Sequence, residues 1–384
     1  MIPLSIFLVC LFFQSPSHIS LTEGPSLTFP DGPIKSFQLV SSLAGKNQFL
    51  AVITNSGTLR LIDGAGKITH TAKGAKDFVA SYKGYLFYIG DGLVKLDLAN
   101  FQTKTFPTTT IESSSLQVLE IASRDVFVRG SKEKVEVLSI SQDTTLASFP
   151  RSSSVRLTSS THAGDFLVMH DRETELAAYR LSSPDPVWRL DAGKKDMKIL
   201  GIAFKSIPNI IFHMKFNPHD RCLYAATMLG DLYKIEVATG HPLLIAKQFA
   251  GSSNNAGLLS DLNFLDIDRD GTDELIASSV DENVYCLSTK DFSIKWQFPS
   301  GNENQSQLGF LDVTGDGIPD VLTINDYDLT LSVLDGTTGR LLSALSCKEP
   351  DSRSQASLLA TDFRGSNEVF VQIKPNRTRV FTIR

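Results

Sequence analysis

Asp266-Ile-Asp-Arg-Asp-Gly-Thr-Asp-Glu274 leads directly into the apolar stretch Leu275-Ile-Ala-Ser278. A second acidic loop, Asp312-Val-Thr-Gly-Asp-Gly-Ile-Pro-Asp320, leads in the same way into Val321-Leu-Thr-Ile324. Both loops place oxygen-bearing side chains at positions 1, 3, 5 and 9 and a glycine at position 6. This spacing is typical of a calcium-binding loop, because a hard cation needs several oxygen ligands and glycine permits the sharp turn between them. Neither loop has the glutamate that an EF-hand carries at position 12, so we expect both loops to connect β-strands.

The remainder of the chain repeats a hairpin whose first strand is apolar or alternating and whose second strand alternates apolar and polar residues. Eight copies begin near Gln48, Gly84, Arg124, Gly164, Asp220, Asp273, Pro319 and Asn367. Most intervals between them are close to the roughly 40 to 50 residues of a four-stranded propeller blade. Further strand candidates flank the hairpins, and no stretch has the apolar spacing of an amphipathic helix of three turns.

The repeat predicts an all-β chain that folds as a single β-propeller over residues 24–384. We expect eight four-stranded blades, and seven if one of the weaker early units is not a true blade. The chain ends at Arg384 inside its last hairpin, so the final blade lacks an outer strand. The segment Ser26-Leu-Thr-Phe29 is expected to supply that strand, because such pairing closes the ring and removes exposed sheet edges.

The N-terminus indicates a secretory route. Residues 1–20 contain a short apolar stretch, Ile6–Phe13, followed by small residues, and they resemble a signal peptide. No later segment reaches the approximately 20 apolar residues that a membrane span needs, so we expect no such span. Two sequons, at Asn304 and Asn376, are candidate glycosylation sites. The sequence therefore predicts a secreted protein or one of the secretory lumen.

Charge and cysteine content exclude some classes of partner and site. The net charge is −5 with a pI of about 5.8, and no basic stripe is present, so a nucleic-acid partner is not expected. After removal of Cys10 three cysteines remain: Cys222, Cys286 and Cys347. Their wide spacing does not match a metal site. We expect them to be buried or to form at most one disulfide bridge.

The two acidic loops resemble those of FG-GAP/VCBS repeat propellers, the group that includes the head of integrin α subunits. The residues that match are Asp266, Asp268, Asp270, Gly271 and Glu274 in the first loop and Asp312, Asp316, Gly317 and Asp320 in the second. Two positions depart from the family pattern: Glu274 replaces the usual final aspartate, and Thr314 replaces an aspartate or asparagine. The resemblance implies that each loop joins the first and second strands of a blade and holds Ca²⁺.

The acidic side chains of the first loop support the same cofactor independently. Four carboxylates at ligand positions within nine residues repel one another unless a cation neutralises them or solvent screens them. At the seventh position of each loop, the backbone carbonyl of Thr272 or Ile318 is a candidate ligand. The second loop has three carboxylates and the hydroxyl of Thr314, so we expect it to bind calcium more weakly. The predicted role of both ions is structural.

Two turns resemble those of quinoprotein-like (PQQ-type) propeller repeats. They lie within Leu232-Tyr-Lys-Ile-Glu-Val-Ala-Thr-Gly240 and Leu334-Asp-Gly-Thr-Thr-Gly339. In that group the motif forms a tight turn between outer strands and does not by itself bind cofactor. Trp188 and Trp296 occupy equivalent outer-strand positions, and we expect them to pack in the core or between blades.

The region from Ile199 to Asp220 inserts extra length before the fifth hairpin. It is either a loop that projects from a propeller face and forms a binding site, or a long strand with a bulge. The charged run Lys194-Lys-Asp-Met-Lys198 just before it is expected to be a solvated loop.

These features favour a non-catalytic, calcium-binding propeller whose faces bind a protein or glycan partner. The prediction of partner binding rests on analogy with other propellers, a fold that carries many functions. Two alternatives stay open at this point. One is a propeller enzyme, such as a polysaccharide lyase, a hydrolase or a quinoprotein, and the other is an assembly factor of the secretory pathway. The sequence does not indicate an oligomeric state.

Overall fold

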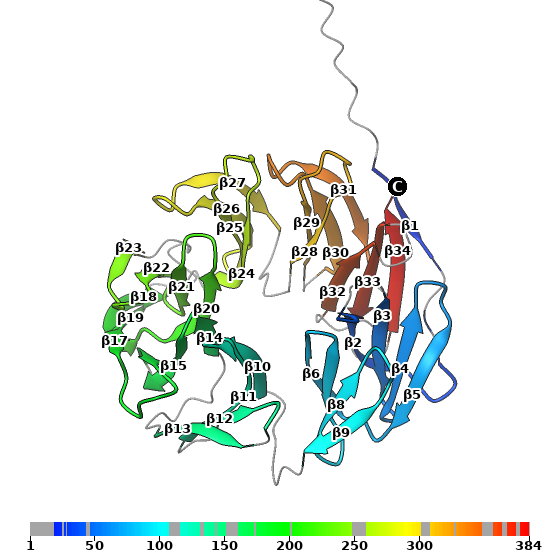
Figure 1. Cartoon of the computed structure of the whole chain (residues 1–384). Coiled ribbons are helices and arrows are strands. Elements are labelled where there is room, and N and C mark those ends of the chain that lie inside the picture. The colour runs from blue at the N-terminus through cyan, green and yellow to red at the C-terminus, as the bar shows by residue number, and fades with distance from the viewer. Residues whose placement is uncertain are drawn as a thin grey trace, which may run out of the picture.

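The computed structural model describes residues 19–24, 27, 29–43, 47–106, 116–130, 134–142, 144–150, 160–172, 174–199, 202–247, 259–300, 308–325, 328–347, 356–362, 367–373 and 377–383. These residues form β-strands joined by turns, with no helix among them, and the strands form a ring of blades (Figure 1). No helix that could cross a bilayer is found in this part of the chain. Residues 1–18 of the predicted signal peptide and both sequon asparagines, Asn304 and Asn376, lie outside the described residues.

Eight four-stranded antiparallel sheets make up the ring. Blade 1 consists of β2 (Ile34–Ser41), β3 (Gln48–Thr54), β4 (Thr58–Asp63) and β5 (Ile68–Lys73). Blade 2 consists of β6 (Asp77–Tyr82), β7 (Tyr85–Ile89), β8 (Leu93–Asp97) and β9 (Thr103–Phe106). Blade 3 consists of β10 (Leu116–Ile121), β11 (Arg124–Gly130), β12 (Lys134–Ser139) and β13 (Thr145–Pro150). Blade 4 consists of β14 (Ser160–Ala163), β15 (Phe166–Arg172), β16 (Glu175–Tyr179) and β17 (Trp188–Asp191).

The second half of the ring repeats the same order of strands. Blade 5 consists of β20 (Ile211–Asn217), β21 (Cys222–Thr227), β22 (Leu232–Glu236) and β23 (Pro242–Ala246). Blade 6 consists of β24 (Leu259–Leu265), β25 (Glu274–Ser279), β26 (Asn283–Ser288) and β27 (Ile294–Pro299). Blade 7 consists of β28 (Gly309–Leu311), β29 (Asp320–Ile324), β30 (Thr330–Leu334) and β31 (Leu341–Ser346). Blade 8 consists of β32 (Ala356–Thr361), β33 (Asn367–Ile373), β34 (Arg377–Ile383) and β1 (Leu21–Glu23).

Each predicted hairpin corresponds to the second and third strands of one blade, so the eight-bladed, all-β prediction is confirmed. These two central strands are buried on both faces, because each blade packs against two neighbours. That double burial is why the hairpins carry the strongest apolar pattern in the sequence. Antiparallel neighbours alternate in direction, so the turns that join the first strand to the second and the third to the fourth meet at one end of every blade. We call that end of the propeller the turn face.

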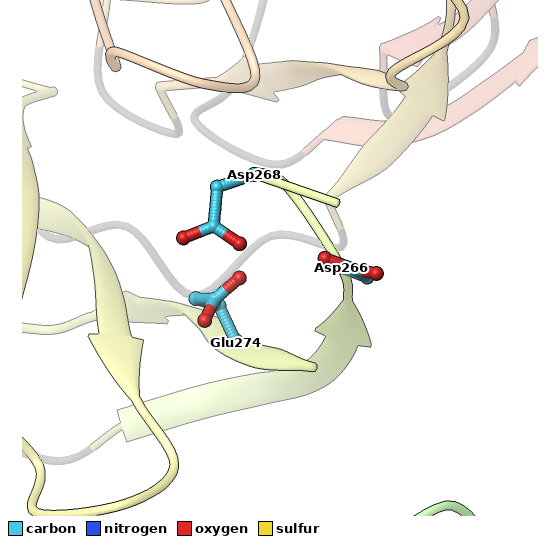
Figure 2. Close-up of side chains that lie close together, drawn as sticks. All are labelled: Asp266, Asp268 and Glu274. Atoms are coloured by element: carbon cyan, nitrogen blue, oxygen red, sulfur yellow. The ribbon is translucent and has the colours of Figure 1, made fainter. Parts of the chain in front are cut away.

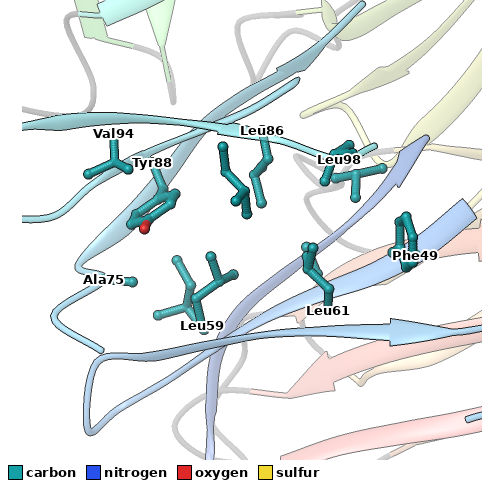
Figure 3. Packing of buried hydrophobic residues seen from close by; sticks show 12 residues of the cluster. Phe49, Leu59, Leu61, Ala75, Leu86, Tyr88, Val94 and Leu98 are labelled. Carbon is teal, nitrogen blue, oxygen red and sulfur yellow. The ribbon is translucent and has the colours of Figure 1, made fainter. Parts of the chain in front are cut away.

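The hydrophobic core consists of eight clusters, each between two neighbouring blades. In the cluster between blades 1 and 2, Leu59 and Leu61 of β4 face Leu86 of β7 and Val94 of β8 (Figure 3). Fully burying side chains of this size contributes about 1.5–3 kcal/mol each, which makes inter-blade packing the main source of stability. The cluster between blades 8 and 1 includes Phe370, so the ring is continuous.

The ring is closed by β1, which pairs antiparallel with β34 through Leu21↔Ile383, Thr22↔Thr382 and Glu23↔Phe381. Closure by an N-terminal strand was predicted, but the segment was wrong: Leu27 and Phe29 of the predicted strand lie outside the sheets. Glu23 forms two hydrogen bonds with Arg379, at 2.7 Å and 2.5 Å, which fixes the register of β1. Ser26–Phe29 lacks any such charged partner for Arg379, and this explains the choice of segment.

The closure of the ring is expected to depend on pH. The hydrogen bonds from Arg379 lower the pKa of Glu23 below its ordinary value of 4.5. A carboxylate whose pKa is depressed by folding stabilises the folded state above the unfolded pKa, and this contribution is lost as pH falls through the folded pKa. The protection factor of the β1 amides, which is corrected for the intrinsic pH dependence of exchange, should therefore fall as pH is lowered below about 4. The variant E23Q should exchange faster at neutral pH and lose most of this pH dependence; equal pH profiles would contradict the assignment.

The predicted insert at Ile199–Asp220 is only in part an insert, because it includes β20, the first strand of blade 5. The extra length is a hairpin outside the eight blades. It consists of β18 (Lys194–Ile199) and β19 (Ile202–Pro208), which pair with each other between blades 4 and 5 (Figure 1). The predicted solvated loop at Lys194–Lys198 is therefore wrong, because these residues pair with β19 as a strand. Lys195 of this hairpin forms an ion pair with Asp231, which is almost fully buried in blade 5. Asn209 donates a second hydrogen bond to Asp231 at 2.9 Å, so the hairpin is attached to blade 5.

Both tryptophans join neighbouring blades, as predicted. The indole N–H of Trp188 donates to the carbonyl of Val237 at 2.6 Å, and that of Trp296 donates to the carbonyl of Gly336 at 3.1 Å. Each acceptor lies in one of the two turns that resemble quinoprotein repeats. Gly240 and Gly339 of these turns adopt φ values of 73° and 68° and lie directly against the indole rings. These turns are therefore docking surfaces for the tryptophan of the preceding blade.

Candidate metal centre

The two acidic loops occupy the predicted place in the fold. The first joins β24 to β25, the first and second strands of blade 6, and the second joins β28 to β29 in blade 7. Both therefore lie on the turn face. Gly271 and Gly317, at the sixth positions, have φ values of 81° and 80°. This left-handed conformation favours glycine, in agreement with the turn that was predicted from the spacing.

The first loop brings three of its carboxylates together. Within the described part of the chain, Asp266, Asp268 and Glu274 form the one group of at least three acidic, histidine or cysteine side chains whose ligand atoms lie within 4.8 Å of one another. Figure 2 shows the carboxylates of Asp268 and Glu274 facing each other, with Asp266 beside them. Two oxygens that bind one calcium ion at about 2.3–2.6 Å can lie at most about 5 Å apart. The three side chains thus have the spacing to share one ion.

The remaining predicted carboxylate ligand of this loop, Asp270, makes other contacts. One carboxylate oxygen of Asp270 accepts the backbone N–H of Thr272 at 2.7 Å, and the other accepts the ammonium of Lys290 at 3.0 Å. Asp270 is therefore not part of the group of three. Asp266 accepts the backbone N–H groups of Asp270 and Gly271, at 3.1 Å and 3.0 Å, which orients its carboxylate.

The side chain of Lys295, on the outer strand β27, contacts the acidic group. Its ammonium donates to Asp268 at 2.7 Å and to Glu274 at 2.6 Å. Burial raises the pKa of Glu274, and the ion pair with Lys295 and the backbone N–H of Ile267 act in the opposite direction. Burial lowers the pKa of Lys295, but its hydrogen bonds to the two carboxylates outweigh burial and raise it overall. The acidic group thus has an internal counter-ion.

Lys290 and Lys295 were missed in the sequence because they lie outside the loop motif. The turn from β26 to β27 carries Lys290, and it meets the loop from β24 to β25 on the turn face. In a propeller blade, the turn between the third and fourth strands lies beside the loop between the first and second strands. Residues of that turn are therefore candidate partners of the loop.

The second loop has a different arrangement. Asp320 is buried, and it accepts the backbone N–H groups of Val313, Thr314 and Gly336 at 2.9, 3.0 and 3.0 Å. Burial raises the pKa of Asp320, and these three hydrogen bonds oppose that shift.

The remaining groups of the second loop form turns. Asp312 accepts the N–H groups of Gly315 and Gly317, both at 2.8 Å, and Asp316 accepts that of Ile318 at 2.8 Å. Among the described residues these three aspartates do not form a group like that of the first loop. Their geometry fits a hydrogen-bonded turn, and we derive no ion there.

The two loops are connected across the interface between blades 6 and 7. The guanidinium of Arg269 donates to the backbone carbonyl of Asp316 and lies against Gly317. The hydroxyl of Thr337 donates to the carbonyl of Ile267 at 3.3 Å. Order in the first loop is therefore coupled to order in the second.

The three described cysteines are buried and unpaired, which agrees with the expectation that they are buried or form at most one bridge. Burial raises the pKa of the Cys347 thiol to about 11 and also raises the pKa of Cys222 and Cys286. These thiols are thus poor nucleophiles at neutral pH.

The fold and the loops together define an eight-bladed β-propeller with a cluster of three carboxylates at one strand connection. The chain is similar in structure to BamB from Moraxella catarrhalis, with a TM-score of 0.58 and 14% identity over 94% of this chain and 100% of that chain. It is also similar to the computationally designed Ika8 protein, with a TM-score of 0.61 and 14% identity over 93% and 98% of the two chains. At this identity the likeness concerns the fold alone. No protein-family model and no curated protein matches the chain, so the resemblance to FG-GAP/VCBS and quinoprotein-like repeats stays a prediction.

Proposed function

We propose that this chain is a non-catalytic β-propeller, secreted or in the secretory lumen, that binds a protein or glycan partner and is stabilised by calcium. The calcium part is supported by one observation: Asp266, Asp268 and Glu274 place ligand oxygens within 4.8 Å of one another. Carboxylate oxygens are the ligands that Ca²⁺ prefers. A bound ion would neutralise three acidic groups at the connection between β24 and β25.

Lys295 sets the conditions for that binding. Because its ammonium already contacts Asp268 and Glu274, calcium has to displace it and so loses part of its binding energy. The variant K295M, which keeps the length of the side chain and removes its charge, is expected to bind Ca²⁺ at least about tenfold more tightly than the wild type. Isothermal titration calorimetry with calcium chloride measures this change directly.

The matched control for this experiment is K290M. Lys290 contacts Asp270, which lies outside the group of three, so its loss should change calcium affinity much less. The double variant D266N/D268N should abolish binding. If wild type and K295M both fail to bind calcium at millimolar concentration, the acidic group is a lysine-neutralised turn and the proposed calcium is wrong.

The binding part is supported by the β18–β19 hairpin. This hairpin is additional to the eight blades and is attached to blade 5 through Asp231. Phe204, on β19, is 43% exposed. Aromatic side chains are enriched in protein interfaces, so this exposed ring is suited to contact a partner. Propeller inserts of this kind are suited to partner binding, because a rigid scaffold positions them.

The binding part is tested by affinity capture from medium and lysate with the variant F204S. The matched control is L243S, which changes an exposed apolar residue on β23, 49% exposed, outside the hairpin. A partner that is retained by L243S and lost by F204S supports the hairpin as the contact. Equal capture by both variants would place the partner elsewhere. N-terminal sequencing and glycosidase treatment of the same material test cleavage near residue 20 and use of Asn304 and Asn376.

A further inference from the structure

One position of the third strand has the same role in most blades. The residue at this position pairs with a residue of the second strand, and its side chain faces the next blade. When that side chain is apolar, it completes the hydrophobic core between the two blades. The residues at this position are Leu61, Val137, Ala178, Cys286 and Val333 in blades 1, 3, 4, 6 and 7. Blades 2 and 5 carry a lysine instead, Lys95 opposite Phe87 and Lys234 opposite Tyr224. A cation at a core position needs a counter-ion.

In blade 5 the protein supplies that counter-ion itself. Lys234 forms an ion pair with Asp220 at 2.9 Å and donates to the backbone carbonyl of Thr289 at 2.9 Å. The ammonium of Lys234 also lies 5.6 Å from the centre of the Tyr224 ring. The lysine of blade 5 is therefore satisfied by groups of blades 5 and 6.

In blade 2 the corresponding counter-ion is missing among the described residues. The ammonium of Lys95 lies 3.6 Å from the centre of the Tyr85 ring, and no described carboxylate lies within ion-pair distance of it. Lys104, directly opposite on β9, adds a second positive charge. Burial lowers the pKa of Lys95, Asp97 and Asp125 oppose this shift, and Lys104 adds to it.

A cavity of about 550 Å³ opens at this position, between blades 2 and 3 on the turn face. This volume lies within the range of small-ligand sites, roughly 300–1,000 Å³. Polar groups that could hydrogen-bond a ligand surround Lys95 in the wall: Tyr82, Ser139, Ser141 and Gln142.

Two charged residues in the wall, Asp125 and Arg124, determine whether an anionic or a cationic ligand fits the cavity. Asp125 also lines the cavity, and its carboxylate accepts the hydroxyl of Tyr82 and the ammonium of Lys83, each at 2.8 Å. Lys83 also contacts Glu120 at 2.8 Å, so this group keeps one negative charge, which the positive charges of Lys95 and Arg124 outnumber. Arg124 contributes a further positive charge to the wall. The free charge of the cavity is therefore positive.

We propose that this cavity binds a carboxylate-bearing sugar residue, with the carboxylate on Lys95 in the place that Asp220 takes in blade 5. The carboxylate restores the ion pair, and the hydroxyl and amide groups of the wall match the hydroxyl groups of a sugar. The size of the cavity favours a ring over a single acidic side chain of a protein. This inference rests on the proposed binding function and adds an acidic glycan as the ligand of a second surface, separate from the β18–β19 hairpin.

The test is titration of the full chain with oligosaccharides that end in glucuronic acid or in sialic acid, followed by calorimetry or ligand-observed NMR. Comparison of these two oligosaccharides shows which acidic sugar supplies the carboxylate. Their neutral counterparts and a glutamate-rich peptide are titrated in parallel. We expect one acidic sugar to bind and its neutral counterpart to bind roughly 10- to 100-fold more weakly, because a charge-assisted hydrogen bond is lost. K95M should lose a similar factor for the acidic sugar.

Melting temperature separates binding from folding. K95M should melt no lower than the wild type, because an unpaired ammonium opposite Lys104 adds no stability. The matched variant K234M should melt lower, since it leaves Asp220 without its cation. Any one of four results would overturn the proposal: no acidic sugar binds, K95M binds the acidic sugar as tightly as the wild type does, K95M unfolds, or only the peptide binds. Lys95 lies in blade 2 and the acidic loops in blades 6 and 7, so titrations repeated with chelator show independently whether the calcium proposal fails.

Discussion

Replacement of Asp320 by alanine is expected to lower the free energy of unfolding by about 3–6 kcal/mol, one of the two largest effects of a single substitution that we predict. The carboxylate is buried and accepts three backbone N–H groups, those of Val313, Thr314 and Gly336. Alanine leaves all three donors without this partner, the N–H of Gly336 in a buried site and those of Val313 and Thr314 in a part-buried one. Each such donor costs about 1–3 kcal/mol, and the cost is least where water can reach it. The substitution also disconnects the second acidic loop from the turn that holds Trp296.

The measurement is equilibrium unfolding in urea, monitored by fluorescence of Trp296 and Trp188. D316A is the matched control, since Asp316 is an exposed loop residue and accepts one backbone N–H in the same loop. It should cost about 1 kcal/mol or less. The loss in D320A should be the same with calcium and with chelator, because hydrogen bonds account for it. A large loss that appears only with calcium would instead make Asp320 a ligand, as the loop spacing predicts.

Replacement of Trp296 by alanine is expected to cost about 3–5 kcal/mol. The indole is 7% exposed, packs in the cluster between blades 6 and 7, and donates its N–H to Gly336. Alanine creates a cavity and leaves the carbonyl of Gly336 without its donor. The contact is also close on the other side, because a Cβ added to Gly339 would lie 2.6 Å from the ring.

Three further variants separate the contributions to this loss of stability. W296F keeps most of the apolar contact and loses the hydrogen bond, so it should cost less than W296A. G339A should destabilise the protein through steric conflict with the ring and through its φ of 68°. W188A tests the same contact between blades 4 and 5, since Trp188 donates to Val237 and lies against Gly240. If W296A unfolds at the urea concentration of the wild type, inter-blade docking by tryptophan contributes little to stability.

The blade repeat could be predicted from sequence because its signal is local. Hairpins such as Gln48–Asp63 combine a continuous apolar strand with a second, largely apolar strand, and both strands are buried between neighbours. The tight turns also follow from local chemistry, since Gly271 and Gly317 adopt the positive φ that the loop spacing requires. Local chemistry also placed the acidic loops between β-strands, and the resemblance to FG-GAP/VCBS loops placed them between the first and second strands of a blade.

The partners of charged side chains could not be predicted in this way. Whether Glu23 or the Ser26–Phe29 segment closes the ring depends on Arg379 at the other end of the chain. The sequence of the first loop indicates a calcium site, but only the fold brings Lys295 from β27 to Asp268 and Glu274.

Two lysines show the limit most clearly. Lys95 and Lys234 occupy matching places in the repeat, and nothing near them in the chain distinguishes a paired from an unpaired cation. The pairing of Lys234 depends on Asp220, which follows β20 and precedes β21, whereas the described surroundings of Lys95 offer a cavity. Strand order and turns follow from patterns within some 15 residues, because backbone conformation and burial are set locally. Counter-ions and cavities arise where neighbouring blades meet, so three-dimensional packing alone decides them.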